Sequence, residues 1–552
     1  MNTENCSGLQ RHIGGLGLLF MSLGAMIGSG WLFASMYAAK IAGPAAIISW
    51  IIGATIMGVI ALAFAELGAM LPIAGGLSRY PHITFGGTTS FVCSWVCWLG
   101  YVAVAPIETM AILEYLGNLV PWLTTVDGTH RSLSLAGTGI AAGILLVLTI
   151  VNTFGVKWLA ESNTWITWWK IAVPVGTAAV LIAYSFEPAN FTSSGFAPSG
   201  LTGIFAAVSL GGVAVSLLGF RIVIEMAGES KNPQRDVPRA IIGSIVLATS
   251  IYILLQCAFI GVVPAETLHD GGWANIVLSG PSGPFAAFAA VLGLQWLAVV
   301  LYIDSTVSPF GTALIYTTGT SRILLAMANN RNIPRWFGRI VGRGIPLHAL
   351  LVNLVVGWIL LAPLPAWSLL AGIIASSTML AGGIGVLGLA VLRRRYPELP
   401  RPLKLPFAMF MCLLGFSFSS LVVFWAGWEA NRTIVIVLLV GIALLAIAVP
   451  QMKVKRSELH ISHSLWLIPY LGVLFTASWL SDYEGGRALI PSPWGDIFIF
   501  AWTFLMGWIA ILTALPRQRS LPLMAAAFEE VKEVHGGVCL IDAKEYAIEH
   551  EL

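Results

Sequence analysis

Four ionisable side chains lie inside long apolar stretches, where they can exchange protons or bind a charged partner. These residues are Glu108, Lys170, Arg221 and Asp304. A charge that leaves water for an apolar surrounding costs free energy unless it is paired, so such residues usually face a cavity or another charge. Burial disfavours the charged form of a lysine, and Lys170 is therefore a candidate to take up and release a proton.

Lys170 lies in the run TWITWWKIAVPVG, about seven residues or roughly 10 Å into its apolar stretch. This depth favours a proton-coupling role. In the alternative interpretation, the lysine extends along Trp165, Trp168 and Trp169 and places its ammonium at the membrane interface. Asp304, in LYIDSTVSPFG, is expected at a similar depth, in the inner part of its stretch. We therefore predict a Lys170–Asp304 pair, or a proton shared between them.

Arg221 has two interpretations that the sequence leaves open. Its guanidinium can hold a ligand carboxylate through two parallel hydrogen bonds. It can equally pair with Glu225, four residues further along the same helical face. Glu108, in APIETMAILEYLG, is a candidate cavity residue, whereas Glu66 is expected to anchor a loop or gate rather than bind a ligand.

The composition indicates which elements position these residues. The chain has 552 residues, of which 57% are hydrophobic and only 10% charged. Because soluble domains carry about 25% charged residues, this composition predicts an all-α polytopic membrane protein. The sequence has no paired His and Cys ligands, no Ser-His-Asp arrangement and no phosphate-binding loop after a strand. We therefore expect no metal, no nucleic acid partner and no enzymatic activity.

Apolar runs long enough to cross a bilayer predict about 14 membrane spans. They fall near 14–38, 44–71, 88–116, 135–155, 164–185, 202–226, 239–263, 284–318, 347–363, 367–391, 405–428, 432–450, 464–480 and 496–515. If the N-terminus lies in the cytoplasm, nearly all Lys and Arg residues of the loops fall on the inner side, as the positive-inside rule requires. This distribution predicts that both termini are cytoplasmic.

Two of these spans contain sequences that are poor helix formers. In the first span the run 24–30, GAMIGSG, has three glycines, and each costs about 1 kcal/mol relative to alanine. A GxxxG packing face accounts for Gly24 and Gly28 but not for the following Ser29-Gly30. The sixth span has a similar run at 211–220, GGVAVSLLGF. Interrupted spans at matching positions of two halves indicate an inverted repeat of five spans with a binding site between the breaks.

Several runs resemble the amino acid–polyamine–organocation superfamily of transporters. They are GAMIGSG, AELGAMLP followed by GG, GF followed by AGESKNPQRDVPRA, and SRILLAMANNRNIPRWF. The resemblance extends over about residues 12–450. This chain also contains the runs GGLSRYP and DSTVSPFG, which resemble runs of the aspartate–proton symporter branch of the superfamily in particular.

The resemblance implies a leucine-transporter-like fold, with a first repeat at 13–185, a second at 202–391, further helices at 405–515, and cytoplasmic ends at 1–12 and 516–552. It assigns the substrate carboxylate to the backbone N–H groups of Ile27, Gly28, Ser29 and Gly30. It assigns the substrate ammonium to carbonyls near Val215, Ser216, Leu217 and Leu218. Gly219 then permits close approach of the backbone, Phe220 is a gate, and Lys170 replaces a sodium ion.

The function expected from this resemblance is proton-coupled amino acid import across the cell membrane by alternating access. The proton is the coupling ion and no other cofactor is expected. Arg221 favours aspartate or glutamate as the cargo. An amino acid exchanger, a neutral amino acid permease, a sensor and a channel are the alternatives. The expected partners are a small amino acid and the lipid bilayer, and the sequence does not determine the oligomeric state.

Overall fold

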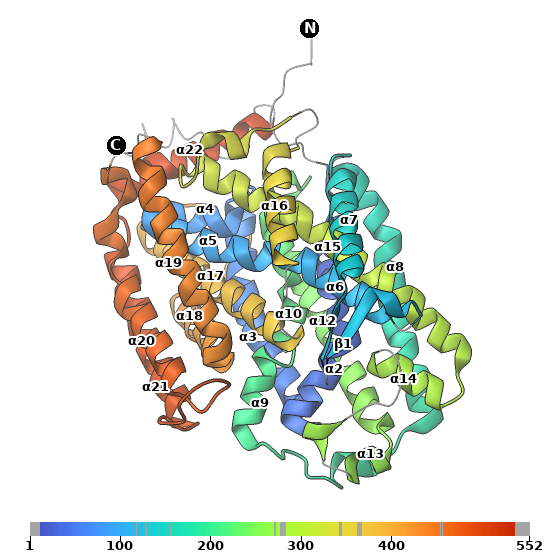
Figure 1. Ribbon diagram of the computed structural model, residues 1–552. Coiled ribbons are helices and arrows are strands. Elements are labelled where there is room, and N and C mark those ends of the chain that lie inside the picture. Colours follow the sequence, from blue (N-terminus) through green and yellow to red (C-terminus); the bar gives the residue numbers. More distant parts are fainter. Residues whose placement is uncertain are drawn as a thin grey trace.

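The structure is a computed structural model that describes residues 12–117, 119–127, 130–154, 156–269, 272–276, 283–341, 345–361, 367–452, 454 and 456–535. Its helices form one bundle, with α4 and α22 at one end and α13 at the other (Figure 1). We call these the α22 end and the α13 end. Of the predicted ends 1–12 and 516–552, residues 1–11 and 536–552 lie outside the described residues.

The first five predicted spans, together with the segment between the second and the third, contain eight helices. These are α1 (Gly15–Met26), α2 (Ser29–Ala42), α3 (Ala46–Met70), α4 (Gly76–Phe85), α5 (Gly87–Val102), α6 (Val104–Leu116), α7 (Leu135–Asn152) and α8 (Val156–Ser185). A short antiparallel hairpin connects α6 to α7, with β1 (Thr124–Asp127) paired to β2 (His130–Leu133).

The next five predicted spans contain the second interrupted segment. Their helices are α9 (Gly200–Ser209), α10 (Val213–Leu217), η4 (Leu218–Phe220), α11 (Arg221–Glu225), α12 (Pro233–Val262), α13 (Ala265–His269), α14 (Pro284–Val291), α15 (Gln295–Asn329), α16 (Leu347–Leu360) and α17 (Trp367–Arg395). Five further helices follow: α18 (Ala408–Trp425), α19 (Gly427–Gln451), α20 (Leu467–Leu480), α21 (Trp494–Thr513) and α22 (Arg517–His535).

The prediction of an all-α polytopic membrane protein is confirmed. Among the described residues, ten helices are long and apolar enough to cross a membrane, or twelve if each bent helix pair is one span. Two shorter apolar helices, α1 and α16, lie within the first and ninth predicted spans. Each of the 14 predicted spans therefore contains helix, and the lower count arises because some spans are broken or short.

Both predicted breaks are present. The first span is interrupted at Ile27 and Gly28, whose backbone angles are not helical, between α1 and α2. The sixth span bends by 45° between α9 and α10. Gly212 at this bend has φ +85°, which favours glycine because a Cβ atom is strained there. A Cβ atom on Gly219 would lie 2.7 Å from the backbone nitrogen of Met26, so glycine lets the two broken spans touch.

The predicted span 284–318 differs from the structure. It consists of a short helix, α14, and the long helix α15, separated at residues 292–294. Asp304 therefore lies in the first third of α15, toward the α13 end, whereas Lys170 lies near the middle of α8. The prediction that Asp304 occupies the inner part of its span was wrong, because an apolar run does not reveal where a helix breaks and a new one begins.

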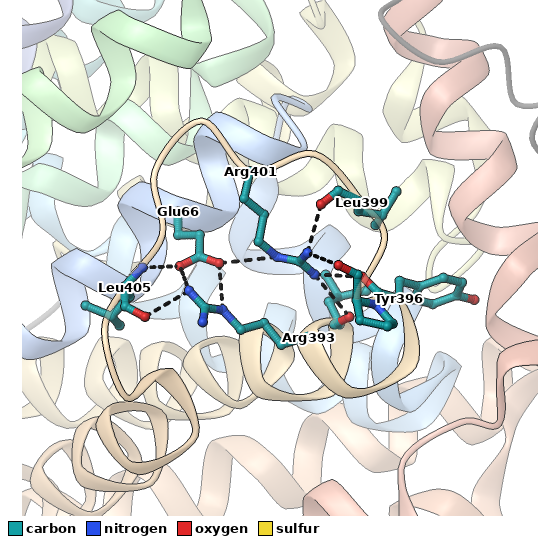
Figure 2. Close-up of polar contacts among 8 residues, drawn as sticks. Glu66, Arg393, Tyr396, Leu399, Arg401 and Leu405 are labelled. Carbon is teal, nitrogen blue, oxygen red and sulfur yellow. Dashed lines mark hydrogen bonds and ion pairs between the residues drawn. The ribbon is translucent and has the colours of Figure 1, made fainter.

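Glu66 anchors the loop that joins α17 to α18, as the sequence indicated (Figure 2). Its fully buried carboxylate accepts hydrogen bonds from Arg393 Nε at 2.8 Å and Nη2 at 2.5 Å. Arg401 Nε lies 3.4 Å from the same carboxylate, and the backbone N–H of Leu405 donates to it at 2.7 Å. Arg401 also donates to the carbonyls of Tyr396 and Leu399, so one carboxylate from α3 fixes both sides of the loop.

Replacing Glu66 by alanine is expected to destabilise the protein by about 3–5 kcal/mol, because two arginines would lose their buried carboxylate partner. The measurement is thermal unfolding in detergent, followed with a dye that fluoresces on reaction with thiols exposed from buried positions such as Cys93 and Cys412. Removing the half-exposed carboxylate of Glu458, which pairs with Arg331, is the matched control and is expected to change stability by less than about 1 kcal/mol. Equal melting temperatures for the two variants would contradict this role of Glu66.

Candidate substrate and proton site

A small cavity lies between the two breaks in the bundle. The first broken span contributes Met26, Ser29 and Gly30, and the second contributes Val215 and Ser216. The remaining wall comes from α6, α15 and α17, and includes Glu108, Thr312, Tyr316, Trp367 and Ile374. The cavity therefore lies where two interrupted helices present backbone groups that the helices themselves leave free.

The structure brings only some of the predicted binding residues to the cavity wall. Ser29, Gly30, Val215, Ser216 and Glu108 line the cavity. The other predicted residues are buried next to it but do not line it; these are Ile27, Gly28, Leu217, Leu218, Gly219, Phe220 and Arg221.

The carboxylate of Glu108 occupies the start of α2. Its Oε2 atom accepts a hydrogen bond of 2.7 Å from the backbone N–H of Ser29, and its Oε1 atom accepts one of 3.0 Å from the Ser29 hydroxyl. A Cβ atom on Gly28 would lie 2.8 Å from the same Oε1 atom, so glycine allows this approach. A helix N-terminus attracts anions. An internal carboxylate therefore occupies the position that the family resemblance assigns to the substrate carboxylate.

Lys170 of α8 forms hydrogen bonds with both the end of α1 and α15. Its ammonium is fully buried and donates to the Gly24 carbonyl at 2.7 Å and to the Thr312 hydroxyl at 2.8 Å. Thr312 in turn donates to the same carbonyl at 2.8 Å. The interfacial interpretation of Lys170 is wrong, because the side chain points into the bundle. A cation at this place complements the partial negative charge at the C-terminus of α1.

Two further side chains bind groups at the first break. Tyr252 of α12 donates its hydroxyl to the carbonyl of Met26 at 2.8 Å. Trp367 of α17 donates to the hydroxyl of Ser29 at 3.3 Å and stacks on Tyr37. Sequence analysis missed Thr312, Tyr252 and Trp367. The sequence could have indicated Thr312, because this polar residue lies eight positions after Asp304 and therefore on nearly the same face of α15.

Asp304 and Lys170 do not form the direct pair that we predicted. Asp304 accepts hydrogen bonds from Trp31 at 2.9 Å, Trp169 at 2.7 Å and Ser308 at 2.7 Å. Lys170 reaches α15 two helical turns further along, at Thr312. The correction follows from the position of Asp304 nearer the α13 end. There its carboxylate joins α2, α8 and α15 through two indole N–H groups.

Asp304→Asn is expected to lower the free energy of unfolding by about 1–3 kcal/mol, because an amide has one acceptor oxygen and leaves a buried indole N–H without a partner. Thermal unfolding measures this effect. Amino acid uptake is expected to fall in Asp304→Asn and to be retained in Asp304→Glu, which keeps both acceptor oxygens. Unchanged stability and uptake in Asp304→Asn would contradict the role of the carboxylate.

Arg221 matches neither of its two sequence interpretations in this conformation. It is fully buried, and its Nη1 atom donates to the Thr378 carbonyl of α17. Glu225 instead accepts a hydrogen bond of 3.3 Å from the backbone N–H of Leu77, so the predicted pair between Arg221 and Glu225 is not formed. Arg221 also lies outside the cavity wall. Ile374 of α17 lines the cavity, and Thr378, the partner of Arg221, follows it by one helical turn toward the α22 end.

A helical bundle with two interrupted spans around a central cavity is the architecture of a membrane transporter. The chain belongs to the amino acid permease family, whose model matches residues 13–475. The family membership agrees with the resemblance found in the sequence motifs.

Two bacterial relatives match nearly the whole chain. The glutamate/serine transporter AimA of Bacillus subtilis is 36% identical over 498 residues, covering 89% of this chain and 92% of that protein. The aspartate–proton symporter of the same organism is 32% identical over 504 residues, covering 91% and 96%. Among solved structures, the nucleobase–cation symport transporter Mhp1 in a closed conformation aligns with a TM-score of 0.51 and 14% identity. It covers 97% of this chain and 99% of that chain, and it shows the fold alone.

Proposed function

We propose that this protein is a proton-coupled symporter that imports acidic amino acids across the cell membrane. The observation that carries the proposal is the pair of buried ionisable groups at the first break, with Glu108 on the N–H of Ser29 and Lys170 on the carbonyl of Gly24. Both groups contact the helix break that borders the cavity, so a change in the protonation of either one acts directly on the binding site.

Glu108 links cargo binding to proton binding. The cargo carboxylate and the Glu108 carboxylate require the same N–H group of Ser29, so they compete for it. A displaced Glu108 stays in a largely apolar cavity, where its neutral form is favoured because an unpaired carboxylate is costly there. Cargo binding and proton uptake by Glu108 are therefore coupled in the same direction.

Lys170 provides the second ionisable group. In its charged form it holds the end of α1 against α15 through Gly24 and Thr312. When the ammonium loses its proton, this charge-assisted contact weakens and α1 is released from α15. Alternating access then consists of movement of the broken spans against the helices that carry Lys170 and Thr312.

The names of the two relatives support an acidic cargo, since both include an acidic amino acid. The relative that transports glutamate and serine also leaves room for a small neutral cargo. The excess of Lys and Arg in the loops at the α22 end supports a cytoplasmic location for that end and for both termini.

Uptake of labelled aspartate, glutamate and serine into proteoliposomes, with and without an inward proton gradient, tests the proposal. We expect acidic amino acids to accumulate above the external concentration only when the gradient is present. Accumulation that requires preloaded amino acid would identify an exchanger instead. Preference for serine would identify a neutral amino acid permease, and binding without saturable counterflow would identify a sensor.

A further inference from the structure

A second group of buried charges lies between the cavity and the α22 end. It consists of Arg221 and Glu225, one turn apart on α11, and the hydroxyl of Tyr101 on α5. Arg221 and Glu225 are completely buried, and Tyr101 is 1% exposed. We call these three residues the inner polar group.

The inner polar group has unused hydrogen-bonding capacity. Within the part of the chain that the structure describes, Arg221 Nε and Nη2, Glu225 Oε2 and the Tyr101 hydroxyl have no partner. Native proteins rarely leave buried polar atoms unsatisfied, so each such atom requires an explanation. Four of them in one group indicate that a polar ligand binds here in another step of the transport cycle.

The free atoms have the arrangement that an amino acid requires. Nε and Nη2 form one edge of the guanidinium, the edge that binds a carboxylate through two parallel hydrogen bonds. Glu225 Oε2 is an acceptor for an ammonium group. Residues four apart on a helix are neighbours, with Cβ atoms about 5–6 Å apart. One ligand with adjacent carboxylate and ammonium groups can therefore contact both side chains.

The surrounding backbone keeps the guanidinium in place. Its Nη1 atom is held by the Thr378 carbonyl, and Gly382 on the next turn of α17 leaves space for Nη2, which a Cβ atom there would approach to 2.1 Å. Toward the α22 end, the N–H of Gly75 donates to the backbone carbonyl of Glu225 at 3.0 Å, and both charged side chains are completely buried in this conformation.

We propose that the inner polar group is a second, transient binding site for the backbone carboxylate and ammonium of the amino acid, occupied between the main cavity and release at the α22 end. This inference rests on the proposed transport function. Arg221 binds the carboxylate and Glu225 binds the ammonium. Because every amino acid carries these two groups, the site does not distinguish acidic from neutral cargo.

Transport kinetics measured separately from each face of the membrane test this site. Uptake into right-side-out and inside-out membrane vesicles gives a KM for the outer and for the inner face. In Arg221→Gln and Glu225→Gln, we expect the inner KM to rise about tenfold, equivalent to about 1.4 kcal/mol, and the outer KM to stay within about twofold. Arg221→Lys keeps the charge but not the two-pronged edge, so an intermediate rise in the inner KM is expected.

Arg331→Gln and Glu458→Gln are the matched controls, because they remove half-exposed charges from the α22 end. Both are expected to leave the two KM values unchanged. Equal changes on both faces, or no change in correctly inserted Arg221 and Glu225 variants, would overturn the inference. An inner KM that rises for aspartate but not for serine would also overturn it, because Arg221 would then bind the side-chain carboxylate. Absence of amino acid flux in the wild type would instead refute the transport function itself.

Discussion

Lys170→Met is expected to reduce both gradient-driven accumulation and counterflow of the cargo to background. Methionine fills most of the space of lysine but cannot donate to the Gly24 carbonyl or to Thr312. The end of α1 then loses the cation that complements its free carbonyl groups, and α1 is no longer held against α15. Because this contact borders the cavity, the loss affects cargo binding as well as coupling.

The measurement is uptake and counterflow of labelled aspartate in proteoliposomes. The matched control is Lys231→Met, which removes an exposed lysine outside the spans and is expected to transport like the wild type. Full proton-driven accumulation in Lys170→Met would contradict any role of Lys170 in coupling. If Lys170→Met shows normal counterflow but no accumulation, Lys170 acts in proton coupling and not in cargo binding.

Glu108→Gln is expected to differ from Lys170→Met in one respect: proton-driven accumulation is lost, but counterflow is retained. Glutamine can still accept a hydrogen bond from the N–H of Ser29, so the resting contact at the start of α2 persists. It cannot take up a proton when the cargo displaces it, so cargo binding is no longer linked to the proton gradient. The inside concentration is then expected to stop at the outside concentration.

The same vesicle assay, with and without an inward proton gradient, measures this effect. Glu114→Gln is the control, because Glu114 lies on the same helix but does not line the cavity. A Glu108→Gln protein that accumulates aspartate with the normal dependence on external pH would show that the coupling proton is carried by another group.

The positions of the breaks and of the deep lysine could be predicted from the sequence, because each leaves a local signal. Glycines at 24, 28 and 30 interrupt an otherwise apolar run, and Lys170 is a charge in the middle of another. The family resemblance adds the fold, and the two breaks five spans apart agree with it, because interrupted spans at matching positions of two halves indicate an inverted repeat. The domain boundaries and the membrane orientation stay predictions.

The partners of the charged residues could not be predicted, because they depend on how helices far apart in the chain pack. Asp304 bonds with Trp31 and Trp169, which lie 273 and 135 residues away, and neither indole has a distinctive sequence signal. Arg221 and Glu225 have the spacing of a helical ion pair, yet Thr378 and Leu77 hold them separately. Sequence spacing predicts which residues can contact each other within one helix. It does not predict whether a residue of another helix binds them instead.

The contact between Glu108 and Ser29 also affects the return half of the cycle. After release of the cargo, the helix N-terminus of α2 would face an apolar cavity without an anion, and closing the bundle around it would bury an unsatisfied N–H group. The tethered carboxylate satisfies that group from within. If the protein is the proposed symporter, the unloaded form is therefore expected to reorient without bound cargo, which is the step that net import needs and that one-for-one exchange does not.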